Sequence, residues 1–316
     1  MVLRFAGMIP GMVSKRVGLG AGHGPAGAGQ RAWRRGVAGV VVGVSLLGAS
    51  VVPAFAAPNP SPSGVLTVRN FCAMAVKRLP SVTLALCEAA ELTTSTGRSV
   101  RGSALLQRDV VSPHARLRVL VIGGIHGDEP SSSALVLHWI RSAQETPSNI
   151  HWRFVPLVNP DGMLKAEPTR TNANGVDLNR NFPTPGWDKE APHYWQKRTG
   201  KDPRRFPGRA PLSEPESRWV HDEMARWKPD LIVSVHAPYG VLDFDGPTVP
   251  PKRLGRLYLD QVGIFPGSLG NYGGVHKKVP VVTIELPSAL RTPQDAEVRQ
   301  MWLDLLRWTA ERLGAD

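Results

Sequence analysis

Short apolar runs alternate with helix-length segments along most of this 316-residue chain, and this alternation limits the folds that it can adopt. Three of the runs are followed at once by Gly123, His236 and Glu285. Strands that alternate with helices predict an α/β fold with a mixed, mostly parallel sheet and helices on both faces. We predict strands over residues 99–107, 116–122, 151–158, 230–235 and 279–284, and helices over residues 130–143, 212–227 and 292–312.

Two further segments flank or interrupt this pattern. Residues 70–92 are predicted to form a small helical cap on the main domain. Residues 182–211 are rich in proline, arginine and lysine and show little periodicity. We interpret them as a functional loop at the rim of the sheet, with a disordered insertion as the alternative.

A basic N-terminal region precedes a short apolar stretch, as in secretory signal peptides. Arg31, Arg34 and Arg35 come before the apolar residues 36–52, and Ala54-Phe55-Ala56 offers small residues for cleavage. A run of about 17 residues is at the short limit for crossing a bilayer, so a membrane anchor is the less favoured alternative. We predict cleavage near Ala56, a periplasmic or secreted product, and no stable membrane insertion after processing.

The net charge of +12 does not indicate nucleic-acid binding once it is divided along the chain. Residues 1–57 contain six basic residues and no acidic ones, which gives +6, and the remaining 32 basic and 26 acidic residues give the other +6. The sequence has no basic stripe with interleaved aromatic residues. We therefore expect no nucleic-acid partner.

The two cysteines, Cys72 and Cys87, follow the predicted cleavage site closely. Disulfides persist mainly in oxidising compartments, so export would favour their pairing, and two buried free thiols are the alternative. Neither cysteine has the spacing of a zinc site. The chain thus divides into a signal peptide over residues 1–57, a linker and small N-terminal segment over residues 58–95, and a catalytic domain over residues 96–316.

Three candidate metal ligands follow predicted strands. His126 and Glu129 come after residues 117–122, three positions apart, and His236 follows another apolar run. Ligands in α/β sheets bind beyond the carboxyl ends of strands. Two histidines and one glutamate form a zinc set that leaves a position open for water. An isolated His-x-x-Glu is common by chance, but this placement predicts one zinc ion per chain. Asp128 either orients His126 or is simply solvated.

The densest group of motifs lies farther along the chain. Asn159-Pro160-Asp161-Gly162 closes a predicted strand, and residues 170–183 contain Asp-Leu-Asn-Arg-Asn. With His126-x-x-Glu129, the later His236 and the strand-ending Glu285, these motifs resemble the zinc carboxypeptidase family in their order and separations. The resemblance implies the fold of that family and a zinc-dependent peptidase or amidase activity.

The resemblance also implies a role for each matching residue. Zinc would be bound by His126, Glu129 and His236, Glu285 would be the general acid and base, Arg170 would stabilise the oxyanion, Asn179 and Arg180 would hold the terminal carboxylate of the substrate, and Tyr272 would be the mobile tyrosine that covers it. These residue types suit the chemistry. A carboxylate near the open zinc position can accept a proton from water, and the planar guanidinium of arginine binds a carboxylate through two hydrogen bonds.

Three segments of the sequence most resemble those family members that cut the bond between γ-D-glutamate and meso-diaminopimelate in cell-wall peptides. These segments are residues 170–183, 234–238 and 267–270. The likeness implies a murein peptide as substrate, although those members act in the cytoplasm and this chain is expected to be exported. Asp243 and Asp245 would then meet the ammonium group of diaminopimelate, unless they only cap a turn.

Two other functions compete with this interpretation. One is a zinc deacylase of the aspartoacylase and succinylglutamate desuccinylase type, which also uses a His-x-x-Glu and an Asp-Leu-Asn-Arg segment. The turn at residues 159–162 and the full Asn-Arg-Asn core favour peptide hydrolysis instead. The other is a non-catalytic cell-wall binding module. Such a module is expected to lack a zinc ligand or Glu285, and this chain has all of them.

Overall fold

The structure is a computed structural model that describes residues 65–314. The predicted signal peptide and its cleavage site near Ala56 lie outside the described residues. The strands are β1 (Thr93–Arg98), β2 (Ala104–Val110), β3 (Leu117–Ile122), β4 (Ile150–Val155), β5 (Leu231–His236), β6 (Val241–Asp245), β7 (Arg253–Leu254), β8 (Leu257–Tyr258) and β9 (Val281–Glu285). The helices are α1 (Val68–Arg78), α2 (Leu84–Ala89), α3 (Pro130–Glu145), α4 (Pro160–Met163), α5 (Trp187–Lys197), α6 (Pro215–Trp227) and α7 (Asp295–Leu313), with the short η1 (Leu178–Arg180), η2 (Pro203–Arg205) and η3 (Gly270–His276).

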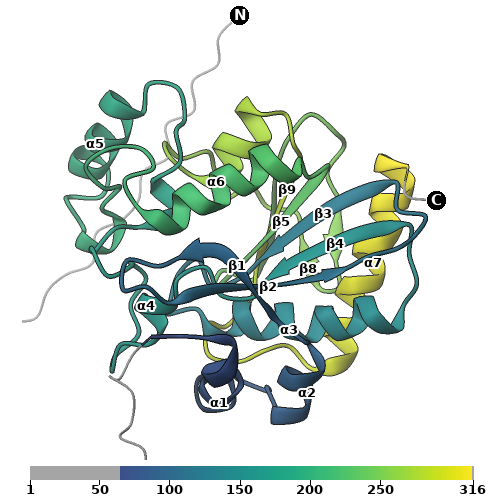
Figure 1. The fold of residues 1–316 in the computed structure, drawn as a ribbon. Helices are drawn as coiled ribbons and strands as arrows, with labels where there is room; N and C mark the ends of the chain where they lie inside the picture. Colours follow the sequence, from purple (N-terminus) through teal and green to yellow (C-terminus); the bar gives the residue numbers. More distant parts are fainter. Residues whose placement is uncertain (1–64, 315–316) are drawn as a thin grey trace, which may run out of the picture. The chain divides into compact units, whose positions relative to one another are not determined.

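Seven strands form the central sheet in the order β1-β2-β4-β3-β5-β9-β6 (Figure 1). The four consecutive strands β4, β3, β5 and β9 are parallel, whereas β2 and β6 pair antiparallel at the two sides and β1 pairs antiparallel with β2. Five of the seven strands therefore run in one direction. This confirms the predicted mixed, mostly parallel sheet. It also brings the carboxyl ends of β3, β5 and β9 to adjacent positions at one edge.

Alternating side chains of the sheet pack into two separate cores. On β3, Val119 and Val121 belong to the core under α3 and α7, while Leu120 and Ile122 belong to the core under α6. This alternation is the two-residue period of a strand buried on both faces. Figure 1 shows α3 and α7 on one side of the sheet and α6 on the other, as predicted.

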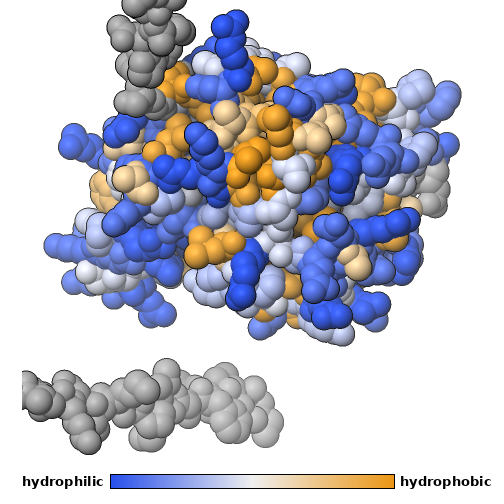
Figure 2. All heavy atoms as spheres, turned by 90° about the horizontal axis from the view of Figure 1, so that it is seen from below, coloured by the Kyte–Doolittle hydropathy of each residue, from blue (hydrophilic) through white to orange (hydrophobic). Residues whose placement is uncertain are grey.

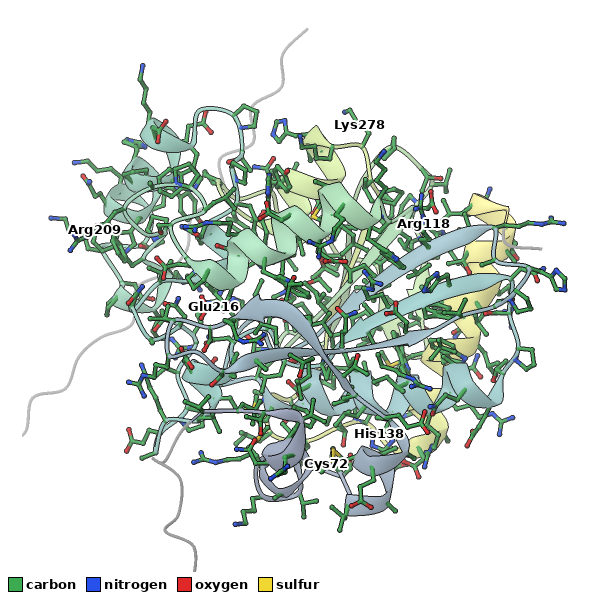
Figure 3. All side chains as sticks on the ribbon, viewed as in Figure 1. Cys72, Arg118, His138, Arg209, Glu216 and Lys278 are labelled. Carbon is green, nitrogen blue, oxygen red and sulfur yellow. A yellow bond between two sulfur atoms is a disulfide. The ribbon has the colours of Figure 1, made fainter. Side chains whose placement is uncertain are left out.

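The N-terminal segment forms the predicted helical cap, in which α1 and α2 are joined by a disulfide between Cys72 and Cys87. Figure 3 labels Cys72 in this cap, whose α2 packs against α3. The two cysteines are 15 residues apart, so closure of this loop contributes about 3 kcal/mol by the chain-entropy relation. The face that carries the cap also shows apolar groups at its surface, among them Val68, Val76 and Leu84 (Figure 2).

The structure differs from the predicted elements in three places. The strand predicted over residues 99–107 begins in a turn, because Ser99–Ser103, with Gly102 at φ +84°, connect β1 to β2, and only residues 104–107 are strand, as the start of β2. Strand β1 crosses the boundary expected between residues 95 and 96, which was to divide the small N-terminal segment from the catalytic domain. Strand β6 was not predicted. Among residues 65–314, no helix has the length and apolar character needed to cross a bilayer.

The segment expected to be an irregular rim loop is ordered and partly helical. It contains α5 and η2, and Pro192 inside α5 hides the helical period in the sequence. Trp187 anchors α5, since its Nε1 donates to the carbonyl oxygen of Arg180 at 2.9 Å. The alternative of a disordered insertion is therefore wrong for this segment.

Candidate active site

The three predicted metal ligands meet at the carboxyl ends of β3 and β5. His126 lies in the loop after β3, Glu129 is the residue before the first turn of α3, and His236 is the last residue of β5. One donor atom from each lies within 4.8 Å of the other two, and all three residues are buried. Nδ1 of His126 is 2.9 Å from Glu129 Oε1 and 3.2 Å from Nδ1 of His236, which is 3.3 Å from Glu129 Oε2.

Glycines and an asparagine turn shape the loop that carries His126. Gly124 has φ +58°, and a Cβ there would strike Ser133 of α3. A Cβ on Gly127 would strike the backbone of Gly162, so the Asn-Pro-Asp-Gly turn packs directly against this loop. Asn159 joins the two, because its backbone N–H donates to the carbonyl oxygen of Gly124 at 2.8 Å. The turn motif therefore acts as a support for the ligand loop.

The second nitrogen of each histidine has its own partner. Nε2 of His126 is 3.1 Å from Oδ1 of Asp177, and Nε2 of His236 is 3.0 Å from the hydroxyl of Ser234. Such partners fix the ring orientation and tautomer of metal-binding histidines. Asp128 does not orient His126; it pairs instead with Arg204 at 2.8 Å. The orienting carboxylate is Asp177, whose only sequence signal was its place in the Asp-Leu-Asn-Arg-Asn motif.

The charges of the cluster suit a bound cation. Although burial alone would raise the pKa of Glu129, the neighbouring histidines hold that pKa well below its usual range. Burial likewise opposes ionisation of Asp177, but Arg170 and His126 lower its pKa. Both carboxylates are therefore ionised. Two imidazoles with Nδ1 facing one carboxylate, each held through Nε2, form a donor set that fits zinc.

Arg170 lies against the ligand cluster. Its Nε donates to Oδ2 of Asp177 at 2.9 Å, and its Nη1 is 3.5 Å from Oε1 of Glu129. Burial would lower the pKa of Arg170, but these two carboxylates raise it. The structure thus places a permanent positive charge beside the candidate zinc position.

Asn179 and Arg180 lie on the short helix η1 that follows Asp177. Only 6% of Arg180 is exposed, and its Nη1 donates to the carbonyl oxygen of Asn179 at 2.6 Å. Its guanidinium lies 4.5 Å above the ring of Phe265, and its Nε has no partner among residues 65–314. Burial lowers the pKa of Arg180 to about 10. Within the same residues it forms no ion pair, although the charge of Asp177 is near enough to raise its pKa.

Glu285 is the last residue of β9 and lies directly opposite His236 in the β5–β9 register. It is 8% exposed, and its Oε2 has no hydrogen-bond partner among the described residues. Burial raises the pKa of Glu285. The carboxyl group is thus next to the ligand cluster, with one oxygen that no group of residues 65–314 contacts.

Tyr272 is not brought to the cluster. It is 4% exposed, lies in η3, and stacks on Phe182 with 5.9 Å between ring centroids. Its other neighbours include His221 of α6, at 5.5 Å between centroids. Tyr272 is therefore packed in the core in this structure, and its assignment as the mobile tyrosine that covers the substrate stays a prediction. The short glycine-rich sequence around it gave no sign that η3 would be buried.

A buried network of amides and carboxylates fixes the block that carries both arginines. Asn172 Nδ2 donates to Glu214 Oε2 at 2.7 Å and to Glu216 Oε2 at 3.1 Å. Asn181 Nδ2 donates to two backbone carbonyls of the rim segment that follows it in the chain, at 2.8 and 2.9 Å. Glu216 is at the start of α6 (Figure 3), and burial raises its pKa to about 7. The asparagines of the motif therefore hold the loop in place.

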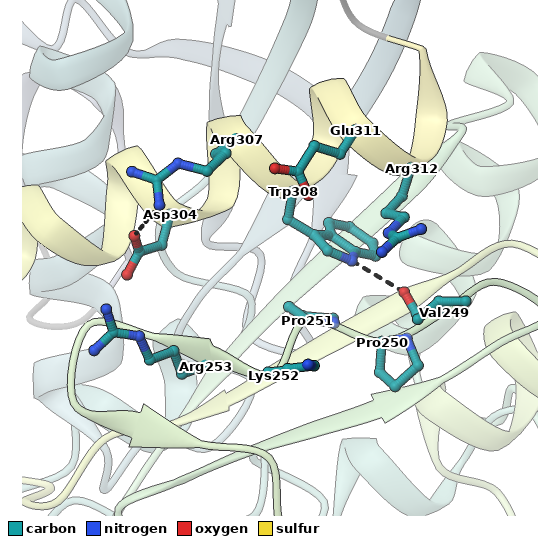
Figure 4. Close-up of a pocket in the computed structure, with 10 residues that line it drawn as sticks. All are labelled: Val249, Pro250, Pro251, Lys252, Arg253, Asp304, Arg307, Trp308, Glu311 and Arg312. Atoms are coloured by element: carbon teal, nitrogen blue, oxygen red, sulfur yellow. Dashed lines mark hydrogen bonds and ion pairs between the residues drawn. The ribbon is translucent and has the colours of Figure 1, made fainter.

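A cavity of about 340 Å³ lies away from the ligand cluster, between α7 and residues 249–253 (Figure 4). Trp308 closes one side of it, and its Nε1 donates to the carbonyl oxygen of Val249 at 3.0 Å. None of the residues that line this cavity belongs to the ligand cluster. The chemistry is therefore expected at the strand ends and not in this cavity.

Comparison with known proteins agrees with this geometry. A zinc carboxypeptidase family model matches residues 86–243. Murein peptide amidase A of Escherichia coli (strain K12) is 31% identical over 219 residues, which cover 67% of this chain and 88% of that protein. The chain belongs to the zinc carboxypeptidase family.

Other similar proteins are consistent with this membership. Murein peptide amidase A of Vibrio campbellii is 33% identical over 202 residues, 61% of this chain and 79% of that protein. Carboxypeptidase A of Helicoverpa armigera has the same fold, with a TM-score of 0.54 at 18% identity over 70% of each chain. Members of the zinc carboxypeptidase family are zinc-dependent hydrolases, so the prediction of a hydrolase is confirmed.

We predict that zinc affinity depends on Asp177 as well as on the ligands. In this zinc carboxypeptidase, His236→Ala should abolish stoichiometric zinc binding, and Asp177→Asn should weaken it about 10- to 100-fold, because His126 loses its orienting carboxylate. Chelator competition on the purified protein measures both. Asp128→Asn is the matched control, since Asp128 is next to the ligand Glu129 in the sequence but pairs with Arg204. Equal losses for both aspartate variants would contradict the assignment.

Proposed function

We propose that this chain is an exported zinc-dependent amidase that hydrolyses cell-wall peptides at the γ-D-glutamyl–diaminopimelate bond. The observation that carries the proposal is the buried Arg180, which forms no ion pair and whose Nε has no partner among residues 65–314. An arginine that is buried without a counter-ion is costly, and a substrate carboxylate would relieve that cost. The enzyme would then cut next to a residue that presents a free carboxylate.

The family relationship supports the choice of substrate. The two murein peptide amidases are 31% and 33% identical to this chain, and the matched segments cover 88% and 79% of their lengths. A shared fold alone does not define a substrate. The proposal therefore also depends on the residues that contact the peptide.

The residues of the site can divide the reaction between them. When bound by His126, Glu129 and His236, zinc supplies a Lewis acid that activates water and polarises a carbonyl. Glu285 would take the proton of the attacking water on its carboxylate and pass it to the leaving nitrogen. Arg170 would donate hydrogen bonds to the oxygen on which negative charge develops.

Export is the second part of the proposal. The disulfide between Cys72 and Cys87 supports it, because such bonds persist mainly in oxidising compartments. The arginines and the apolar run before Ala56 support it further. We infer a soluble product that meets murein peptides outside the cytoplasm, with no nucleic-acid partner.

We expect the protein made in its host to begin after Ala56. The physical reason is the short apolar run followed by small residues at the cleavage site. N-terminal sequencing of the periplasmic or secreted fraction measures this. An intact N-terminus recovered in the membrane fraction would instead identify the run as an anchor.

The catalytic roles predict two different kinetic defects. Glu285→Gln should lower kcat by at least about 10²-fold, because the amide cannot carry the proton. Arg170→Ala should lower kcat by about 10²- to 10³-fold with a smaller change in KM, because its contact strengthens mainly in the transition state. Zinc content serves as the control and should stay at the wild-type level for Glu285→Gln. Near-normal kcat in either zinc-loaded variant would contradict its role.

If Arg180 binds a substrate carboxylate, the enzyme should prefer substrates in which that carboxylate is free. Amidation of the substrate carboxylate should cost about 2–4 kcal/mol in kcat/KM, because Arg180 is left buried and unpaired. The free tripeptide L-Ala-γ-D-Glu-diaminopimelate and its amide measure this difference. Arg180→Ala should abolish it, whereas Arg205→Ala should not, because Arg205 is more exposed and lies 3.6 Å from Asp202.

The same assay separates the competing functions. N-succinylglutamate as the preferred substrate would favour the zinc deacylase. Absence of turnover on every peptide, with zinc bound, would favour the binding module. Equal rates on the free and amidated tripeptides would remove Arg180 from substrate recognition.

A further inference from the structure

A second cavity, of about 420 Å³, lies between the helices α3 and α7. His138, which Figure 3 labels, lines it from α3, and Trp302 lines it from α7. None of the lining residues belongs to the ligand cluster. A helix rises about 1.5 Å per residue, so His138 lies about 14 Å along α3 from the candidate zinc ligand Glu129. The cavity is therefore separate from the candidate active site.

Two buried nitrogen atoms in the wall of this cavity lack a hydrogen-bond partner. They are Nδ1 of His138 and Nε1 of Trp302, and neither has a partner among residues 65–314. His138 is 6% exposed and Trp302 is 1% exposed. A buried polar group without a partner is costly, and an indole N–H can only donate. A ligand that accepts hydrogen bonds would remove this cost.

The other nitrogen of His138 is already held by the N-terminal cap. Its Nε2 is 3.0 Å from the hydroxyl of Ser81, which lies 2.5 Å from the hydroxyl of Thr292. Burial lowers the pKa of His138, so the ring is neutral and carries one proton. When Thr292 donates to Ser81 and Ser81 donates to Nε2, that proton is on Nδ1. Both unpartnered nitrogens are then donors, which suits a carboxylate.

Four charged side chains line the cavity, Arg141 and Glu145 from α3 and Asp295 and Arg299 from α7. All four are exposed, and none forms an ion pair within the described part of the chain. Besides burial, Arg141 lowers and Asp295 raises the pKa of His138, so one cation and one anion lie near that wall. These charges would match a ligand that carries both an ammonium group and a carboxylate.

The rest of the wall is apolar and firmly packed. Val298 and Leu303 line the cavity beside Trp302. The ring of Trp302 is held from behind, with its centroid 4.6 Å from that of Trp152 and 5.5 Å from that of Trp139. A wall of this kind suits an aliphatic group. The volume falls within the range of about 300–1,000 Å³ that is usual for small-molecule sites.

We propose that the cavity between α3 and α7 binds a small amino acid with an aliphatic side chain. Its carboxylate accepts hydrogen bonds from Trp302 and His138 beside Arg141, and its ammonium group faces Asp295. The aliphatic side chain lies against Val298. This second binding site is independent of the substrate that the zinc site cleaves.

Three probes with one carbon chain test the proposal. They are L-norleucine, hexanoate, which lacks the amino group, and pentylamine, which lacks the carboxylate. Each is titrated into the purified zinc-loaded protein while the indole N–H signals are followed by NMR, and Trp302→Phe identifies the signal of Trp302. L-Norleucine should shift that signal saturably. The other two probes should bind at least about 10-fold more weakly, because each loses one charged group.

Matched controls keep the result specific to this cavity. The indole signal of Trp308 should not move, because Trp308 is on the same helix but donates to the carbonyl oxygen of Val249 beside the other cavity. Arg141→Gln should weaken L-norleucine binding at least about 10-fold. Arg312→Gln should leave it unchanged, since Arg312 is an exposed arginine of α7 that lines the other cavity.

Several results would overturn the proposal. An unchanged Trp302 signal would mean that water alone satisfies both nitrogens. A shift confined to other indole signals would place the amino acid elsewhere, for example at the zinc site. Equal affinities for the three probes would remove the role of the charges. If Trp302→Phe does not fold, a crystal grown with L-norleucine decides, because the ligand either occupies this cavity or does not.

Discussion

A single buried carboxylate, Asp177, connects the metal-ligand loop to the short helix η1 that carries Asn179 and Arg180. It lies 3.1 Å from Nε2 of His126, accepts a hydrogen bond from Nε of Arg170 at 2.9 Å, and accepts another from the backbone N–H of Asn179 at 3.0 Å. With no exposure to solvent, it depends entirely on these partners. Loss of one partner would weaken the other two, so the ligand set and the arginines form one unit.

Other charges in the site are left without partners, and this has a functional meaning. Arg180 is buried, and its Nε has no partner among residues 65–314; Oε2 of the buried Glu285 has none there either. Such groups lower the stability of the fold, and proteins keep them mainly where a ligand needs them. The two cores on either side of the sheet provide the rigidity that holds these charges apart.

Much of the architecture could be predicted from the sequence because the apolar runs are strong local signals. β3, β5 and β9 were expected from their apolar residues, and the ligands at their ends follow from where parallel strands terminate. β1 and β6 carry polar residues, such as Thr94 and Asp243, and their strand character comes from pairing with neighbours rather than from their own pattern.

The sequence by itself determined the family, the sheet and the three residues that can hold zinc, because each is written in short motifs after apolar strands. Tertiary structure decided which acid supports His126. Asp128 is nearer in sequence but pairs with Arg204, and Asp177, from the loop between α4 and η1, contacts the ring of His126. Tertiary structure also buried Tyr272 under α6. Contacts between segments far apart in the chain set both outcomes, and no local pattern records such contacts.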